Sequence, residues 1–348
     1  MKINSKILIA ILAAALYGIS APASKILLRE LNPLFMAALL YLGAGLGMWI
    51  YSVFANTKKS QKIEASLSKK EMPYIAAMIL LDVAAPILLL LGLQRTTAGT
   101  ASLLNNFEIV ATSIIALVFF KEAIDKRQWI AMALIIAASA ILTFGAADGF
   151  SLSFGSIFIL LACLSWGFEN NCTRQLSLKN PVQIVIIKGF GSGIGALIVC
   201  AIWGDFAAHI IYVILALVLG FVAYGLSILF YIFAQRSLGA ARTSIYYSIA
   251  PFIGVLLSWL ALREKITAGF LTALFLMIIA TYFMVTELHS HTHVHSPLSH
   301  NHKHTHDNEH HNHTHAEKVD GFHTHQHTHD AVEHSHSHYP DEHHRHEH

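Results

Sequence analysis

The chain is poor in charge: Asp, Glu, Lys and Arg make up 13% of its 348 residues, about half the share of a typical soluble domain. Its three cysteines, Cys163, Cys172 and Cys200, lack CxxC spacing, which argues against a disulfide framework or a cysteine metal site. The net charge of +2 with His neutral is too small to indicate nucleic-acid binding. The sequence has no HExxH or phosphate-loop motif of an enzyme. Sparse charge beside 55% hydrophobic residues indicates a membrane protein instead.

The apolar residues gather in ten segments, each long enough to cross about 30 Å of hydrocarbon as a helix. Gly and Pro interrupt these segments and polarity does not alternate along them, which favours helices over a barrel. The expected fold is an all-α polytopic membrane protein with ten transmembrane helices, over residues 6–28, 33–54, 73–93, 99–120, 128–146, 154–173, 181–203, 208–234, 242–262 and 266–286.

Lys and Arg residues in the loops and at the span ends are shared unequally between the two faces of the membrane. Fourteen lie on the face of the N-terminus and five on the other. Because such residues concentrate on the cytoplasmic side, we expect a cytoplasmic N-terminus in the plasma (inner) membrane. An even number of spans then places the C-terminus in the cytoplasm as well.

A weak internal repeat relates the two halves of the apolar region. The stretch TTAGTASLLNNFEIVATSIIALVFFKE, residues 96–122, aligns with LGAARTSIYYSIAPFIGVLLSWLALRE, residues 238–264, and a basic residue followed by Glu closes each. Five spans per half is an odd number, so the second copy enters the membrane from the opposite side. The sequence therefore predicts two inverted five-helix repeats, residues 1–146 and 147–288, an architecture typical of alternating-access transporters.

The sequence resembles the EamA-type members of the drug/metabolite transporter superfamily over nearly all of residues 6–286. The resemblance rests on the ten spans, on the starts TAGTASLL and GAARTSIYY, and on the closing acids Glu122 and Glu264. The family's proline is kept as Pro251, whereas Ile109 replaces it in the first half. The resemblance implies a secondary carrier for small solutes, often an exporter, with a central cavity between the halves.

Several polar residues fall inside predicted spans, where an ionisable side chain is costly and normally faces the bundle interior or water. We expect Asp82 and Glu108 to take a proton-coupling or cation-binding role; alternatively, one or both are neutral or pair with Lys188 or Arg95 to hold helices together. Lys188 could instead extend its ammonium group to the cytoplasmic face. The substrate or coupling candidates are Asp82, Asn105, Asn106, Glu108, Glu169, Asn170, Lys188, Tyr246 and Tyr247.

Two further groups have a simpler structural interpretation. Tyr246 and Tyr247 could stack on a substrate or merely anchor the membrane interface. Glycines four residues apart, Gly43 with Gly47 and Gly191 with Gly195, let helix backbones approach closely, and we prefer this packing role to a substrate contact.

Residues 289–348 differ from the rest of the chain, because they hold 23 of the 24 histidines and only eight hydrophobic residues. This tail has too few apolar residues to bury a hydrophobic core, so it is expected to be disordered without metal. Its repeated His-x-His pattern places imidazoles on one side of an extended chain, which suits Zn, Ni, Co or Cu. The expected metal ligands are His289, His291, His293, His295, His300, His302, His304, His306, His311, His313, His315, His323, His325, His327, His329, His334, His336 and His338.

The sequence predicts a secondary transporter, and we favour export as its direction. Its cytoplasmic tail is expected to bind divalent transition metal, either to regulate transport or to deliver cargo. The alternatives are a membrane-anchored metal buffer or sensor without transport, and a carrier whose substrate is the metal itself. No catalytic residue and no required cofactor are expected. The expected partners are the lipid bilayer, a small-molecule substrate and metal ions, with no nucleic acid; a homodimer is left open.

Overall fold

The computed structural model describes most of the apolar region and four short pieces of the tail. The described residues are 5–54, 69–121, 124–144, 153–174, 176, 179–238, 243, 246–285, 290–294, 298–304, 323–329 and 333–337. Two of the residues singled out above, Glu122 and His289, lie outside this part of the chain, as do several tail histidines.

The apolar region is helical, as the sequence predicts. Its elements are α1 (Ser5–Gly18), α2 (Ser20–Leu27), α3 (Pro33–Phe54), the short 3-10 helix η1 (Lys69–Glu71), α5 (Met72–Arg95), α6 (Ala98–Leu104), α7 (Phe107–Phe120), α8 (Lys126–Phe144), α9 (Phe154–Arg174), α10 (Pro181–Trp203), α11 (Ile210–Leu219), the π-helical segment η2 (Gly220–Leu226), α12 (Ser227–Leu238), α14 (Ala250–Leu262) and α15 (Ala268–Val285).

Seven stretches are long and apolar enough to cross a membrane. They are Lys6–Leu27, Pro33–Phe54, Lys69–Arg95, Ala98–Phe119, Lys126–Phe144, Pro181–Trp203 and Ile210–Ala234. The other three predicted spans coincide with α9, which carries the polar run from Glu169 to Asn171, and with the shorter helices α14 and α15. Seven candidate spans are thus confirmed, and a total of ten stays a prediction.

Local sequence explains where several helices begin. Thr97 precedes α6, and its hydroxyl accepts a hydrogen bond from the Thr100 amide at 3.1 Å. Asn180 precedes α10 in the same way and accepts from the amides of Val182 and Gln183, with Pro181 as the first helical residue. Such side chains satisfy amide groups that a helix cannot bond internally.

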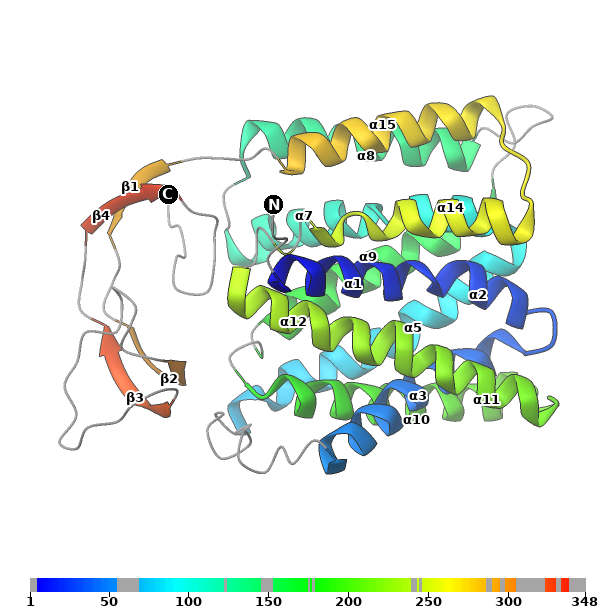
Figure 1. Cartoon of the computed structure of the whole chain (residues 1–348), viewed down its shortest axis with the longest axis horizontal. Helices are drawn as coiled ribbons and strands as arrows, with labels where there is room; N and C mark the ends of the chain where they lie inside the picture. Colours follow the sequence, from blue (N-terminus) through cyan, green and yellow to red (C-terminus); the bar gives the residue numbers. More distant parts are fainter. Residues whose placement is uncertain are drawn as a thin grey trace.

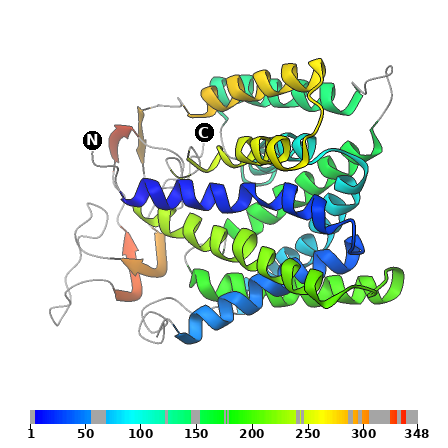
Figure 2. The same ribbon diagram turned by 45° about the vertical axis from the view of Figure 1, so that its right-hand side comes forward.

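The helices lie side by side along one axis (Figure 1), and α8 pairs with α15 at one edge of the bundle in both this view and Figure 2. α3 packs on α10, α5 on α9, α1 on α12, and α6 on α14. The largest cluster of buried apolar side chains joins α3, α5 and α9 to the helices around them, and a second cluster lies between α8 and α15. Helix α1 begins, and α15 ends, at the same end of the bundle.

Several predicted spans are discontinuous, which the sequence analysis did not anticipate. The span expected over 6–28 consists of α1 and α2 with a turn at Ile19, and a turn at Ser248 and Ile249 precedes α14 in the span expected over 242–262. The span expected over 99–120 consists of α6 and α7, separated by a turn at Asn105 and Asn106. The span expected over 208–234 contains the π-helical segment η2 and continues to Leu238. Short side-chain amides compete for backbone hydrogen bonds, and Asn106 Nδ2 donates to the Leu103 carbonyl at 3.1 Å. Discontinuous helices at membrane depth are tolerated where protein buries them.

Four tail segments are strands, whereas the sequence predicts an unstructured tail. β1 (Ser290–Val294) pairs antiparallel with β4 (Glu333–Ser337), and β2 (Leu298–His304) with β3 (His323–His329). Strict two-residue alternation of His with other residues, several of them Thr, suits an extended chain. The expectation that the tail as a whole is disordered without metal stays a prediction.

Candidate functional site

An ion-pair triad lies inside the bundle, formed by Asp82 of α5, Lys188 of α10 and Glu169 of α9. Lys188 Nζ lies 3.1 Å from Asp82 Oδ2 and 3.0 Å from Glu169 Oε1. The Asp82 side chain is fully buried, and only 11% of the Lys188 side chain is exposed. The structure thus has the Asp82–Lys188 pairing that the sequence left as an alternative, and the ammonium group of Lys188 does not extend to a membrane face.

Two hydroxyl groups complete the surroundings of the triad. The Tyr41 hydroxyl donates to Asp82 Oδ1 at 2.8 Å, and Thr173 Oγ1 donates to Glu169 Oε1. Tyr41 comes from α3, so four helices meet here. The sequence analysis missed both residues. Only the hydroxyl group of Tyr41 in the middle of an apolar span could have pointed to this residue. Two carboxylates share one ammonium, which leaves the triad one negative charge in excess when all three groups are ionised.

Glu108 lies in the first turn of α7, where the helix dipole favours an anion. Asn170 Nδ2 of α9 donates to Glu108 Oε1 at 2.7 Å and lies 3.3 Å from Thr112 Oγ1. Asn171 Nδ2 also ties the two helices together, since it donates to the Thr112 carbonyl at 3.2 Å. Glu108 keeps partial exposure, unlike Asp82.

The turn between α6 and α7 contributes to a small cavity. Tyr17, Ser20, Ser102, Asn105 and Pro251 are among its lining residues. The family resemblance implies a central cavity between the halves, in which the polar residues of the spans could meet. The structure divides them: Asp82, Lys188 and Glu169 form the buried triad, Glu108 and Asn170 form a second pair, and Asn105 alone of the candidates lines this cavity.

Tyrosine rings connect the two polar groups. The Tyr41 ring lies 5.6 Å from the Tyr224 ring, and the Tyr17 ring lies 6.1 Å from Tyr224 and 5.8 Å from Tyr247, between ring centroids. The sequence candidate Tyr247 therefore faces the interior, while Tyr246 is half-buried. Asn106, the remaining candidate, is 3% exposed, and its side-chain amide donates to the Leu103 carbonyl of the preceding helix α6.

The four glycines singled out for packing lie against other helices. A methyl group at Gly43 would overlap the backbone of Leu217 in α11, and one at Gly47 would overlap the Phe221 ring. A methyl group at Gly191 would come within 2.6 Å of Ile79, and one at Gly195 within 2.5 Å of Val83, both in α5.

Glu264 links the two halves at the start of α6. Its Oε1 accepts from the Ala98 amide at 2.7 Å, and its Oε2 accepts from the Gly99 amide at 2.8 Å. The carboxylate thereby caps a helix that belongs to the other half of the chain. Glu122, its counterpart in the repeat, lies outside the described residues.

The histidines predicted to bind metal belong to the tail and not to the helices of this interior site. The register places His300, His302 and His304 of β2 opposite His327, His325 and His323 of β3. It also places His291 and His293 of β1 opposite His336 and His334 of β4. The remaining expected ligands among the strands include His329, opposite Leu298. Among the side chains that the structure describes, no group of three His, Cys, Asp or Glu is arranged to hold a metal ion.

Comparison with known proteins adds to this geometry. The sequence pattern of the EamA-like transporter family matches residues 4–144 and 153–286. An uncharacterized transporter of Methanothermobacter thermautotrophicus is 26% identical over 270 residues, which cover 73% of this chain and 78% of that one. The crystal structure of a protein with 12% identity superposes with a TM-score of 0.61, covering 80% of this chain and 95% of that chain. This last similarity concerns the fold alone.

Proposed function

Since the chain belongs to the EamA-like transporter family, we propose that it is a secondary carrier that moves a small solute across the plasma membrane by alternating access, in the direction of export. Its ten spans form two inverted five-helix repeats, with both chain ends in the cytoplasm. A polytopic transporter, and not an enzyme, is the class to which the family belongs.

The observation that carries this proposal is that the buried polar contacts join the two halves. Asp82 belongs to the first half, whereas Lys188 and Glu169 belong to the second. Glu108 and Asn170 are likewise drawn from different halves. Buried ion pairs are weak sources of stability because desolvation offsets their attraction. Their place between the halves instead suits groups whose partners change as one half moves against the other.

The packing of the helices supports the inverted repeat. Exchanging the halves turns the contact of α5 with α9 into a contact of α1 with the span made of α11, η2 and α12. It turns the contact of α7 with α9 into a contact of α14 with α1. Both contacts are present, and η2 and α12 make the first of them. The pairs α3 with α10 and α8 with α15 map onto themselves. This is the pattern expected of a pseudo-twofold axis between the halves.

Backbone details recur at equivalent positions. Lys121 ends α7 and Arg263 ends α14, and among the described residues these two alone, glycine excepted, have positive φ, 54° and 51°. Each donates its amide to a carbonyl five residues or fewer upstream, Ala116 and Trp259 respectively. A turn also precedes both α7 and α14, at Asn105–Asn106 and at Ser248–Ile249. Discontinuous helices at matching points of two repeats commonly build a transporter's substrate site.

Transport can be tested by counterflow in reconstituted vesicles with a panel of metabolites and metal ions. Glu108→Gln should lower flux at least tenfold without lowering the amount of protein inserted, because the acid lies deep in the bundle and faces the other half. Glu30→Gln, at an exposed loop carboxylate, is the matched control. Equal flux of the wild type and Glu108→Gln would remove this acid from the mechanism, and no counterflow of any solute would contradict the transporter proposal.

We further propose that the tail binds divalent transition metal. Opposed histidines in the strand register support this, because directly paired residues share one face of a two-stranded sheet with Cβ atoms about 4.5–5.5 Å apart. Four imidazoles from two neighbouring pairs supply the nitrogens of a tetrahedral site. Bound metal would then regulate the carrier or supply its cargo.

Deleting residues 289–348 separates these possibilities. A regulated carrier should retain flux and lose its response to metal. A membrane-anchored buffer or sensor should give no measurable flux with the intact chain, and its deletion should lower metal tolerance alone. A carrier of the metal itself should exchange labelled metal in counterflow, with or without the tail.

A further inference from the structure

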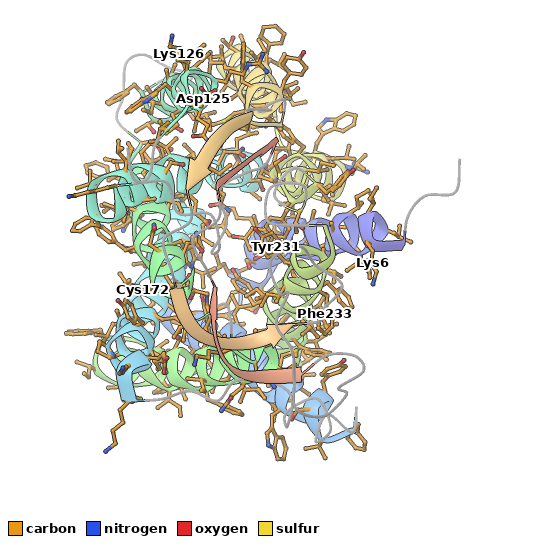
Figure 3. All side chains as sticks on the ribbon, turned by 90° about the vertical axis from the view of Figure 1, so that its left-hand side faces the viewer. Lys6, Asp125, Lys126, Cys172, Tyr231 and Phe233 are labelled. Carbon is orange, nitrogen blue, oxygen red and sulfur yellow. The ribbon has the colours of Figure 1, made fainter. Side chains whose placement is uncertain are left out.

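Four tyrosines, Tyr17, Tyr224, Tyr231 and Tyr247, lie close together in the interior of the bundle. Tyr17, Tyr231 and Tyr247 keep partial exposure although they lie within or beside helical segments. The Tyr231 and Tyr247 ring centroids are 4.9 Å apart, and those of Tyr17 and Tyr247 are 5.8 Å apart. In Figure 3 Tyr231 points toward the middle of the bundle, whereas Lys6 lies at its rim. We call Tyr17, Tyr224, Tyr231 and Tyr247 the tyrosine cluster.

Glu108 lies one helical turn from Asn105, since its amide donates to the Asn105 carbonyl at 3.1 Å. Its carboxylate is also near enough for its charge to act on the hydroxyl groups of Tyr17, Tyr224 and Tyr247. Tyr17 also lines the small cavity beside Ser102 and Asn105. An anion, several aromatic rings and a cavity wall therefore occupy one part of the interior. The cluster draws on both halves of the chain, so a ligand held there would contact both.

The charge balance of the interior decides which ligand fits. Asp82 and Glu169 share Lys188, whose ammonium lies 3.1 and 3.0 Å from them. Among the described residues no Lys, Arg or His forms an ion pair with Glu108, whose hydrogen-bond donor is the neutral Asn170 amide. Glu108 is therefore the interior acid without an ion pair of its own: the charge of Lys188 acts on it only from beyond contact distance, and this ammonium already has two anionic partners.

We propose, granted the transport function above, that Glu108 and the tyrosine cluster bind an organic ammonium ion without a carboxylate, such as an aryl-alkylamine. The ammonium supplies the missing counter-charge, and aromatic faces attract a cation within about 6 Å of the ring centroid. The carboxylate of an amino acid would need a cation of its own, and Lys188 is already paired. A carboxylic acid would meet Glu108 as a like charge, which is unfavourable in a low-dielectric interior.

Four compounds with one ring and different charge test this directly: phenethylamine, 2-phenylethanol, phenylalanine and 3-phenylpropionate. Their affinities are measured on the purified full-length protein in lipid nanodiscs. Phenethylamine should bind at least tenfold more tightly than each of the other three. Equal or tighter binding of any of them would overturn the proposal. This comparison uses the wild type alone, so it does not depend on a variant folding.

Variants then locate the site. Glu108→Gln should weaken phenethylamine at least tenfold, and Tyr17→Leu or Tyr247→Leu by roughly three- to thirtyfold, the range of a cation over an aromatic face. Tyr51→Leu, a tyrosine outside the cluster, should leave the affinity unchanged. Unchanged binding in folded Glu108→Gln would contradict the proposed site.

Flux measured beside binding distinguishes this inference from the transport proposal. Glu108-dependent binding of phenethylamine without any flux would support the site and contradict transport. Counterflow of another solute, without phenethylamine binding, would support transport and overturn the site.

Discussion

Lys188 holds its place through two carboxylates from different helices. With 11% of its side chain exposed, its ammonium has lost most of its hydration, and the attraction of Asp82 and Glu169 offsets that loss. Removing the cation would leave two carboxylates buried together. The residue is thus essential to the local charge balance even where the triad adds little net stability.

Lys188→Met should lower the free energy of unfolding by about 3–5 kcal/mol, because it breaks a buried pair from one side. Lys179→Met is the control: Lys179 pairs with Glu71 at 3.3 Å, but both side chains are more exposed, 15% and 19%, and the loss should stay near 0–1 kcal/mol. Unfolding in mild detergent, followed by intrinsic fluorescence, measures both.

The double variant Lys188→Met with Asp82→Asn should recover part of the lost stability, since it also removes one of the uncompensated charges. A double variant less stable than Lys188→Met would show that Asp82 does not depend on this lysine for its charge balance.

The sequence predicts which residues matter where the free-energy cost of burying an ionisable group identifies them. Asp82, Glu108 and Lys188 stand out because an ionisable group within an apolar span is expensive. Their partners were not predictable, since a pairing across the bundle depends on how helices rotate about their axes. Tyr41 and Thr173 illustrate this: each bonds a charged residue, yet neither differs in type from many neutral neighbours.

At the scale of elements, hydropathy locates the helices but not their interruptions. The predicted span 33–54 coincides with α3, and 181–203 with α10, because proline begins each helix and apolar residues fill it. The turn between α6 and α7 was missed, because the mean hydropathy of a span of about 20 residues stays high although the polar Asn105 and Asn106 interrupt the apolar run. The tail's pairing was missed for another reason: strand partners are set by contacts between segments distant in the sequence.

The contact between α3 and α10 depends on glycine at the crossing. A Cβ at Gly45 would lie 2.8 Å from the Phe190 amide nitrogen, which belongs to the backbone and cannot turn away. Gly45→Ala should therefore destabilise the protein by about 1–3 kcal/mol despite alanine's higher helix propensity.

Gly225→Ala, in η2 where this segment packs on α3, is the comparison variant, because the nearest atoms to its added Cβ lie at 3.3–3.4 Å instead of 2.8 Å. We expect a change below about 1 kcal/mol there. Thermal unfolding of both variants decides the point, and equal stability of Gly45→Ala and the wild type would mean that the two helices can separate without cost.

The capping of α6 by Glu264 gives a second prediction at this scale. Glu264→Ala leaves the Ala98 and Gly99 amides without their charged acceptor and should cost about 1.5–3 kcal/mol. Glu264→Gln keeps one acceptor oxygen and should cost less. Equal loss in both variants, measured by thermal unfolding, would indicate that the charge and not the hydrogen bonds supports the helix.

At the scale of the whole molecule, the proposed inverted repeat assigns equivalent loops to opposite faces of the membrane. Asp125 lies just before α8 and Thr267 just before α15, at places that the proposed repeat makes equivalent, and both are exposed. Helices α8 and α15 pack together along their length, and α15 ends at the end of the bundle where α1 begins (Figure 1). An inverted repeat requires that these two equivalent positions face opposite sides of the membrane.

Single cysteines at these two places test the arrangement in a background where Cys163, Cys172 and Cys200 are alanine. A membrane-impermeant maleimide should label Thr267→Cys in intact cells, because its loop is expected outside. It should label Asp125→Cys, and an epitope fused after His348, only once the membrane is permeabilised, because positive charge holds that face in the cytoplasm. Labelling of both cysteines from the same side would mean that the halves are not inverted, since equivalent loops of inverted units cannot share a face.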